Sequence, residues 1–225
     1  MSNKPAIAVV LSGCGVYDGA EIHESTLTML ALDRQGAAYQ CFAPNIDQAH
    51  VVNHLSGEAT QESRNVLVEA ARIARGDIKD LKEFKADDFD AIIFPGGFGA
   101  AKNLSSFAFD GADCTVNDDV RTAVKAVQAA SKPIGALCIA PAMMARIFED
   151  GDMTIGQDPG TAEAIEAMGG NHKPATHGEV VVDDALRLVT SPCYMLDANI
   201  SQIADGTENA VRTLLDMVNQ DKQAA

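Results

Sequence analysis

The chain is short of positive charge, of paired cysteines and of long hydrophobic runs. Its 17 Lys and Arg residues are outnumbered by 32 Asp and Glu residues, which leaves a net charge of −15 at pH 7. Nucleic acids and anionic membranes are bound by clustered Lys and Arg, so this balance argues against both as partners. The apolar run near the N-terminus, AIAVVL, is interrupted too early for a signal peptide or a membrane-spanning helix.

The cysteines indicate a reducing environment. They are odd in number and form no CxxC pair, which is more typical of free thiols than of a disulfide framework (Cys14, Cys41, Cys114, Cys138 and Cys193). We therefore expect a cytoplasmic protein. No repeat, low-complexity tract or linker divides the 225 residues, of which 47% are hydrophobic and 22% charged. This length and composition predict a single α/β domain over residues 1–225.

Strands and helices are expected to alternate along the chain. Buried strands are predicted around residues 6–12, 37–44, 89–94 and 133–137, and a hairpin over 178–192 that turns at Asp183 and Asp184. Helices are predicted over 21–36, 60–76, 117–132, 140–148, 161–170 and 200–220. Alternation of this kind is typical of a mostly parallel sheet that helices cover on both faces.

The most informative segment is KPIGALCIAPAMMARIF, which places Cys138 between a predicted strand and a predicted helix. Small residues, Ala136 and Ala140, lie on either side, as in a nucleophile elbow where the backbone is crowded. The positive end of the following helix would favour the thiolate of Cys138 over the thiol. The alternative is a buried cysteine that acts only as a small hydrophobic side chain.

Loops at the carboxyl ends of parallel strands meet at one rim of the sheet. Glu24 lies in the first turn of a helix that begins at this rim, so it is our candidate acid to face Cys138. Partial burial there would raise its pKa and suit it to proton transfer near neutral pH. Periodicity alone hardly separates Glu24 from Glu21 and Asp18, which stay open as alternatives.

The segment PGGFGAAKN supplies glycines to the same rim. The backbone N–H groups of Gly97 and Ile139 could form an oxyanion hole, although any tight turn after a strand also uses glycine. GGFG lacks the Lys-Ser/Thr ending of a phosphate-binding loop and the GxGxxG spacing. We therefore expect this segment to bind no nucleotide phosphate.

The histidines offer no convincing metal site. His50 and His54 are four residues apart and could share one face of a helix, but the only further ligand in view is Glu58. We expect no bound metal. His177 precedes a predicted strand and could approach the rim, although a solvated loop position is the simpler interpretation.

Several segments together resemble a known family. ALCIAP, PGGFGAAKNLS and the acid before TLTMLALDRQG look like the PfpI/ThiJ branch of the class I glutamine amidotransferase-like superfamily. VVLSGCGVYDGAEIHE, NHLSGEA, RNVLVEAARIARG and CIAPAMM resemble its ElbB family in particular. The resemblance implies a flavodoxin-like α/β sandwich, usually a homodimer. It also implies that Cys138 is the nucleophile, Glu24 the helix-start acid and Gly97 the oxyanion glycine. ElbB-like proteins are described as cofactor-independent glyoxalases, a kind of lyase, with an older link to isoprenoid biosynthesis.

Two departures from the superfamily narrow the function. Ile139 stands where PfpI-type peptidases carry their catalytic histidine, and no His-x-Glu follows Cys138 as it does in the amidotransferases. Without a histidine base, peptidase and glutaminase activities lose their support. A Cys138–Glu24 pair fits aldehyde chemistry, so we expect conversion of glyoxal, and of related small 2-oxoaldehydes, to the hydroxy acid. Alternatives are a thiol-based redox or stress sensor with Cys14 as resolving thiol, and an amidase or deglycase acting on amine adducts.

Overall fold

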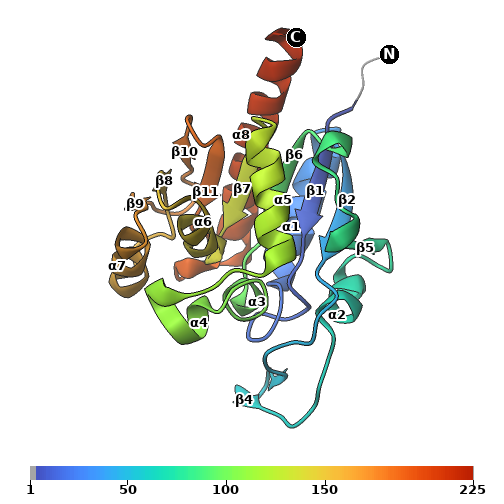
Figure 1. Ribbon diagram of the computed structural model, residues 1–225, viewed down its shortest axis with the longest axis vertical. Coiled ribbons are helices and arrows are strands. Elements are labelled where there is room, and N and C mark those ends of the chain that lie inside the picture. The colour runs from blue at the N-terminus through green and yellow to red at the C-terminus, as the bar shows by residue number, and fades with distance from the viewer. Residues whose placement is uncertain (1–3, 225) are drawn as a thin grey trace.

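The computed structural model describes residues 4–224, and a twisted seven-stranded sheet lies at its centre (Figure 1). The strand order is β10-β11-β7-β6-β1-β2-β5, and every neighbouring pair is parallel except β10 and β11. The strands are β1 (Ala6–Val10), β2 (Ala38–Ala43), β5 (Ile78–Asp80), β6 (Ala91–Phe94), β7 (Ile134–Leu137), β10 (Val181–Asp183) and β11 (Leu188–Ser191). The predicted α/β fold with a mostly parallel sheet is confirmed, as is the hairpin near the C-terminus.

Helices cover both faces of this sheet (Figure 1). On one face lie α5 (Asp118–Ala129) and α6 (Ala140–Phe148), and on the other α1 (Ile22–Arg34), α2 (Val66–Ile73) and α8 (Ile200–Ala224). Shorter helices are α3 (Phe98–Lys102), α4 (Phe107–Asp110), α7 (Pro159–Ala167) and the 3₁₀ turns η1 (Leu81–Glu83), η2 (Ala86–Asp88), η3 (Gly111–Asp113) and η4 (Cys193–Met195). The layers form the flavodoxin-type sandwich that the family resemblance implies.

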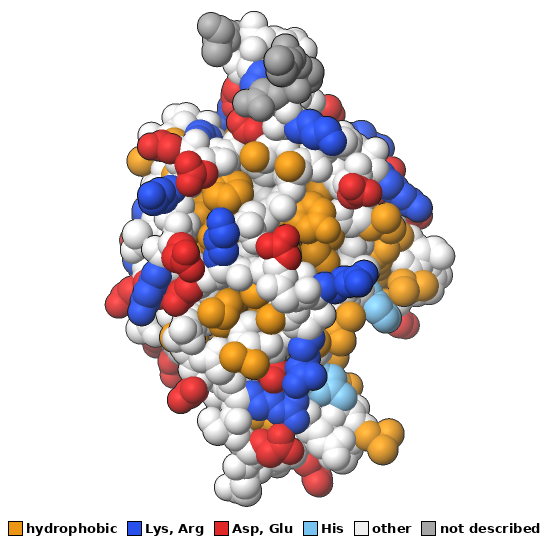
Figure 2. All heavy atoms as spheres, turned by 90° about the vertical axis from the view of Figure 1, so that its right-hand side faces the viewer, with side chains coloured by type: hydrophobic (Ala, Val, Ile, Leu, Met, Phe, Trp, Pro, Cys, Tyr) orange, Lys and Arg blue, Asp and Glu red, His pale blue; other side chains and the backbone are white. Residues whose placement is uncertain are grey.

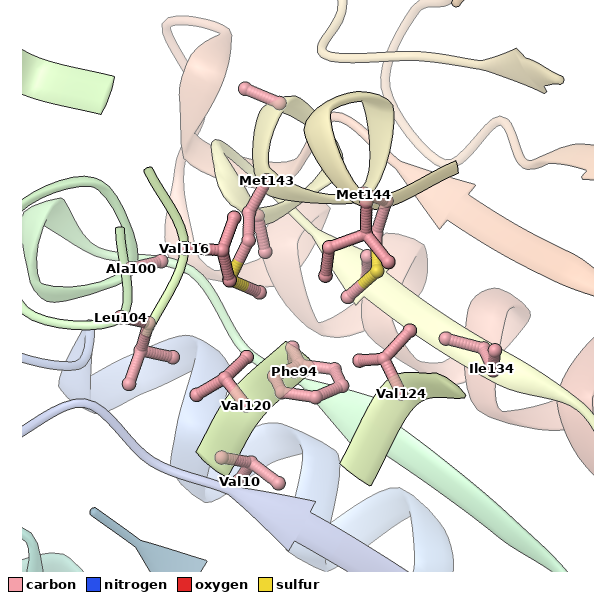
Figure 3. Close-up of a cluster of buried hydrophobic side chains, with 14 of the residues drawn as sticks. Val10, Phe94, Ala100, Leu104, Val116, Val120, Val124, Ile134, Met143 and Met144 are labelled. Atoms are coloured by element: carbon pink, nitrogen blue, oxygen red, sulfur yellow. The ribbon is translucent and has the colours of Figure 1, made fainter. Parts of the chain in front are cut away.

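The central strands are apolar on both sides because each side meets a helical layer. In β6, Ile92 and Phe94 point into the core beneath α5 and α6, where Phe94 packs near Val120 and Val124 (Figure 3). Ile93, between them in sequence, joins the opposite core formed with α1 and α8. Alternate side chains of a strand point to opposite faces, so a strand buried on both faces needs an uninterrupted apolar sequence.

The region between β2 and α2 differs from the prediction. The helix expected over residues 60–76 begins only at Val66, where the Asn65 side chain caps it by accepting from the N–H of Val68. The residues before it pair with the preceding loop instead, as in the bond from Thr60 N to Val51 O. Between these lies the short hairpin of β3 (Val52–Asn53) and β4 (Glu58–Ala59). A second small sheet joins β8 (Asp152–Met153) to β9 (Asn171–His172).

The face at the β5 edge of the sheet carries basic and acidic side chains side by side (Figure 2). Arg64 and Arg72 both form ion pairs with Glu69 of α2, and Arg64 also pairs with Glu62. The cations on this face are therefore partly neutralised by neighbouring carboxylates. None of the helices within residues 4–224 combines the length and hydrophobicity that crossing a membrane requires.

Candidate active site

Cys138 lies on a sharp turn between β7 and α6. Its φ of 59° is left-handed, a conformation that costs a non-glycine residue about 1–2 kcal/mol, and its N–H donates to the carbonyl of Ser191 at 2.9 Å. Ala136 and Ala140, on either side, are fully buried where the strand and helix crowd together. This is the geometry of a nucleophile elbow, as the sequence pattern predicts.

Glu24 reaches the elbow from the first turn of α1. Its side chain is completely buried and lies close enough to the Cys138 thiol for each group to shift the pKa of the other. Two backbone donors hold the carboxyl group: Gly96 N–H to Oε2 at 2.9 Å and Tyr194 N–H to Oε1 at 3.1 Å. The loops after β6 and β11 therefore fix an acid that α1 presents to the sulfur. The catalytic role of the pair stays a prediction.

Gly96 is the residue that allows the acid and the thiol to meet. A Cβ atom added there would lie 2.5 Å from Glu24 Oε2 and 2.8 Å from Cys138 Sγ, and it would overlap Cys138 Cβ. Gly97, next in sequence, has a φ of 99°, and a Cβ there would overlap the backbone of Glu21. Both positions thus require glycine, because the loop after β6 runs directly against α1 and the elbow.

Burial sets the protonation of the pair. The pKa of Glu24 is raised from 4.5 to about 7, chiefly by burial, although the Tyr194 N–H opposes the rise. The pKa of Cys138 is raised well above its ordinary value, first by burial and second by the charge of Glu24, with the Gly97 N–H lowering it. The expected rise for Glu24 is therefore present.

The expectation that the α6 N-terminus would favour a thiolate is wrong for this resting state. The helix does begin at Ala140, directly after the elbow, but complete burial and a neighbouring carboxylate outweigh the dipole of one helix end. The resting sulfur is a thiol, and Glu24 is the group placed to take its proton.

The proposed oxyanion donors lie beside the sulfur. The Gly97 N–H is directed at Cys138, and Ile139 occupies the N-cap position of α6. The first N–H groups of a helix have no intrahelical acceptors, so the start of α6 can offer donors to a bound oxygen. Their role in stabilising an oxyanion stays a prediction.

The alternative bases are placed elsewhere. The Oδ2 of Asp18 accepts from Val52 N at 2.7 Å, and the Oε2 of Glu21 accepts from the N–H of Glu24 at 2.7 Å as the N-cap of α1. His177 lines a separate cavity beside α8, with Gln202 and Asp205. Of the candidate acids, Glu24 is the one whose charge raises the pKa of Cys138.

The thiol near the pair is Cys193 and not Cys14. Cys193 is buried at the exit of β11, and its charge interactions link it to both Glu24 and Cys138. Cys14 interacts instead with Glu69, Arg72 and Asp18 on the α2 side of the loop. The role of Cys14 as resolving thiol stays a prediction, and Cys193 is the thiol whose charge acts on Cys138.

The histidines do not form the helical pair considered above. His54 lies after β3, where its Nε2 accepts from Tyr17 N at 3.2 Å and its Nδ1 is 3.0 Å from Val52 O. His50 stacks edge-on against Phe109. Neither residue is in a helix. Within residues 4–224, no group of three or more His, Cys, Asp or Glu side chains could hold a metal ion.

Two positions that sequence reasoning missed complete the site. Tyr194 contributes its N–H to Glu24, and its hydroxyl group lies 2.8 Å from His23 Nδ1. Gly96 contributes the other N–H. The signal for Tyr194 is its place just after a strand, since β11 ends at the same rim as β7. A cavity of about 420 Å³ opens at Cys138, lined also by Gly97, Ile139 and Tyr194.

The mostly parallel sheet between two helical layers is the fold of DJ-1/ThiJ-like proteins. The fold matches Drosophila melanogaster DJ-1beta with a TM-score of 0.57 at 16% identity, over 99% of this chain and 97% of that one. It matches glyoxalase III from Candida albicans with a TM-score of 0.59 at 15% identity, over 93% and 97%. At such low identity these likenesses establish the fold alone.

Sequence relatives establish the family. The chain is 46% identical to human "Glutamine amidotransferase-like class 1 domain-containing protein 3, mitochondrial" and 45% identical to the rat "ES1 protein homolog, mitochondrial". Each alignment covers 96% of this chain and 85% of the relative. A solved "isoprenoid biosynthesis protein with amidotransferase-like domain" from Ehrlichia chaffeensis is 37% identical with a TM-score of 0.87, over 94% and 99%. The chain belongs to this ES1/ElbB-like family of class I glutamine amidotransferase-like proteins. No family model matches it.

The relatives overturn the expectation of a cytoplasmic protein. The human, rat and Danio rerio relatives are all mitochondrial proteins. The argument from free cysteines separates oxidising from reducing compartments, and it does not distinguish one reducing compartment from another. We therefore withdraw the cytoplasmic assignment.

Proposed function

We propose that this protein is a cofactor-independent glyoxalase that converts glyoxal to glycolate. The observation that carries the proposal is the buried Cys138–Glu24 pair, in which a carboxyl group with a pKa of about 7 lies beside an elbow thiol. Within residues 4–224 the hydrogen-bond partners of the Glu24 carboxyl group are backbone N–H groups and include no histidine. The pair lacks the histidine base that the peptidase and glutaminase activities require. Addition to an aldehyde requires a nucleophilic sulfur and a group that accepts its proton, and Cys138 and Glu24 supply both.

The reaction begins as the Glu24 carboxylate accepts the thiol proton while the Cys138 sulfur adds to one aldehyde carbon. The product is a hemithioacetal, whose oxygen lies within reach of the Gly97 and Ile139 N–H groups. Glu24 then moves a proton from this carbon to its neighbour through an enediol. The resulting thioester is hydrolysed by water, which releases glycolate and restores the thiol, so glyoxal and one water give one glycolate.

The raised pKa of Glu24 suits this sequence of proton transfers. A carboxyl group with a pKa of about 7 is present in both protonation states near neutral pH, so it can both accept and return a proton. An exposed glutamate at its ordinary pKa would be a much weaker base. Gly96 and Tyr194 keep the carboxyl group oriented during the transfers.

Two substitutions test the proposal. Cys138→Ala should abolish glycolate formation because no covalent intermediate can form, while Glu24→Gln should reduce it by about 10²–10⁴-fold. Glu24→Gln should still form a hemithioacetal that native mass spectrometry detects as the added mass of one glyoxal, and Cys138→Ala should not. Cys14→Ala, which alters a thiol outside the site, is the matched control and should retain glycolate formation. Wild-type turnover in Cys138→Ala would refute the nucleophile.

The same assay separates the alternatives. A thiol-based redox sensor would consume glyoxal or peroxide only once per protein and would show no turnover. An amidase or deglycase would release product from an aldehyde–amine adduct faster than from the free aldehyde. Either outcome would replace the glyoxalase proposal.

A further inference from the structure

The turn η4 is joined to α1 at two successive residues of the helix. The N–H of Tyr194 donates to Oε1 of Glu24 at 3.1 Å, and the Tyr194 hydroxyl group lies 2.8 Å from Nδ1 of His23. The two rings also meet at an angle of 46°, with their centroids 5.9 Å apart. Within residues 4–224, these are the two hydrogen bonds that connect η4 with α1. The side-chain bond is therefore the immediate neighbour of a backbone bond that holds the Glu24 carboxyl group.

Regular secondary structure does not set the position of the Tyr194 N–H. η4 is a turn of only three residues, and within the described chain no side chain caps its start. Cys193, just before Tyr194, has a left-handed φ of 44°. Such a conformation persists at a non-glycine residue only where the surrounding structure holds it. Burial of Cys193 in the core supplies part of this restraint, and the contact between Tyr194 and His23 adds to it.

The side-chain bond can form in both protonation states of His23. A phenol hydroxyl group both donates and accepts, so it can donate to the Nδ1 of a neutral imidazole or accept from the Nδ1–H of a charged one. Burial raises the pKa of Tyr194, and the charges of Glu21 and Glu24 raise it further, so the hydroxyl group keeps its proton. Titration of the exposed His23 side chain would therefore leave the contact in place.

The ionisation of Glu24 depends on the Tyr194 N–H more than on its other favourable contacts. Burial raises the pKa of Glu24 most, and the Tyr194 N–H is the largest influence in the opposite direction. The charge of Glu21 raises this pKa further, whereas the Cys138 thiol lowers it. Cys193 also faces the carboxyl group, since the charge of Glu24 raises the pKa of that thiol. Loss of the Tyr194 bond would therefore raise the pKa of Glu24 above about 7.

We propose that His23 and Tyr194 are positioning residues for the glyoxalase reaction, an inference that rests on the function proposed above. Their side-chain hydrogen bond holds η4 against α1, so that the Tyr194 N–H stays on the Glu24 carboxylate while this group takes the thiol proton of Cys138. Neither side chain has to touch the substrate in this role. A loosened η4 would leave the Gly96 N–H as the remaining backbone donor to the carboxylate.

Carbon-13 NMR of protein labelled at the glutamate carboxyl carbons follows Glu24 directly. Its signal is the one missing from Glu24→Gln, and in the wild type it should titrate near pH 7. Tyr194→Phe, which removes only the hydroxyl group, and His23→Ala should each raise the midpoint by about 0.5–1 pH unit. His23→Asn, whose amide group can hydrogen bond from the place of Nδ1, should restore the wild-type midpoint. The double variant should shift no more than either single variant, because both changes remove the same bond.

Glyoxal kinetics show whether the contact serves the reaction. The pH dependence of kcat/KM reports groups of the free enzyme, so with Glu24 as base Tyr194→Phe and His23→Ala should lower kcat/KM about 3- to 10-fold at pH 6. The difference should vanish by about pH 9, where Glu24 is ionised in every variant. Tyr39→Phe and His50→Ala make the same chemical changes at exposed positions outside the site, and they should match the wild type.

The two experiments separate the contact from the function. Unmoved NMR midpoints in both single variants would overturn the positioning role, even if the wild type converts glyoxal. Shifts that add in the double variant would also overturn it, because the two side chains would then act independently. An equal loss of kcat/KM at every pH would show a merely structural role. If the midpoints move as expected but the wild type converts no glyoxal, the contact still holds Glu24 and the glyoxalase function fails.

Discussion

Replacing Glu24 by Gln should change how stability depends on pH. The pKa of Glu24 is about 7 in the folded protein, against 4.5 when the group is free in solution. Between these two values the native state binds a proton that the unfolded chain has released. The contribution of this group is therefore fully present below about pH 4.5 and is lost as the pH rises through 7.

The magnitude follows from the same shift. A rise in pKa from 4.5 to about 7 corresponds to about 3 kcal/mol, and because Glu24 is completely buried no allowance for solvent screening is needed. Gln cannot ionise, so its contribution is independent of pH. It has only one acceptor oxygen for the two N–H groups of Gly96 and Tyr194, which adds a constant cost of about 1–3 kcal/mol.

Urea unfolding at pH 5, 6, 7 and 8 measures the effect. Between pH 5 and pH 8, the free energy of unfolding should fall by about 2–3 kcal/mol more for the wild-type protein than for Glu24→Gln. The two curves of stability against pH therefore converge as the pH rises. Glu58→Gln, which removes a charge from an exposed glutamate of β4, controls for the change in net charge and should parallel the wild type. Parallel curves for wild type and Glu24→Gln would refute the assignment of a near-neutral pKa to Glu24.

Two further predictions concern the same site. Gly96→Ala should lower glyoxal turnover at least about 10²-fold and the free energy of unfolding by about 1–3 kcal/mol, because the added Cβ would separate Glu24 from Cys138. Gly160→Ala, where a Cβ has room, is its control in the same turnover and urea assays, and equal activity of the two variants would contradict the reasoning. Incubation with EDTA should leave glycolate formation unchanged, whereas loss that zinc restores would reveal a metal requirement.

The elbow could be predicted because its determinants are local. Ala136, Cys138 and Ala140 lie within one short segment, and the ends of β7 and α6 are marked by the sequence around them. The choice among Asp18, Glu21 and Glu24 could not be made this way. It depends on how α1 is rotated against the sheet, which a tertiary contact with the β6 loop decides. Family resemblance, and not periodicity, singled out Glu24.

The neighbours of the elbow depend on strand order. β11 lies directly beside β7, so the turn after β11 brings Cys193 and Tyr194 to the pair. No local sequence pattern predicts that the C-terminal hairpin joins the sheet beside β7.

Whether the pKa of Cys138 is raised or lowered could be decided only from the fold. A helix N-terminus is visible in the sequence, but the depth of burial is not, and burial is the larger effect here. A thiol that is protonated at rest and a carboxyl group that titrates near neutral pH form one unit, because Glu24 raises the pKa of Cys138 while the Cys138 thiol lowers the pKa of Glu24. In the proposed reaction Glu24 takes the proton as the sulfur attacks, so Glu24→Gln slows this step without removing the sulfur that forms the adduct. Gly96 and Tyr194 hold the carboxyl group in place for the transfer.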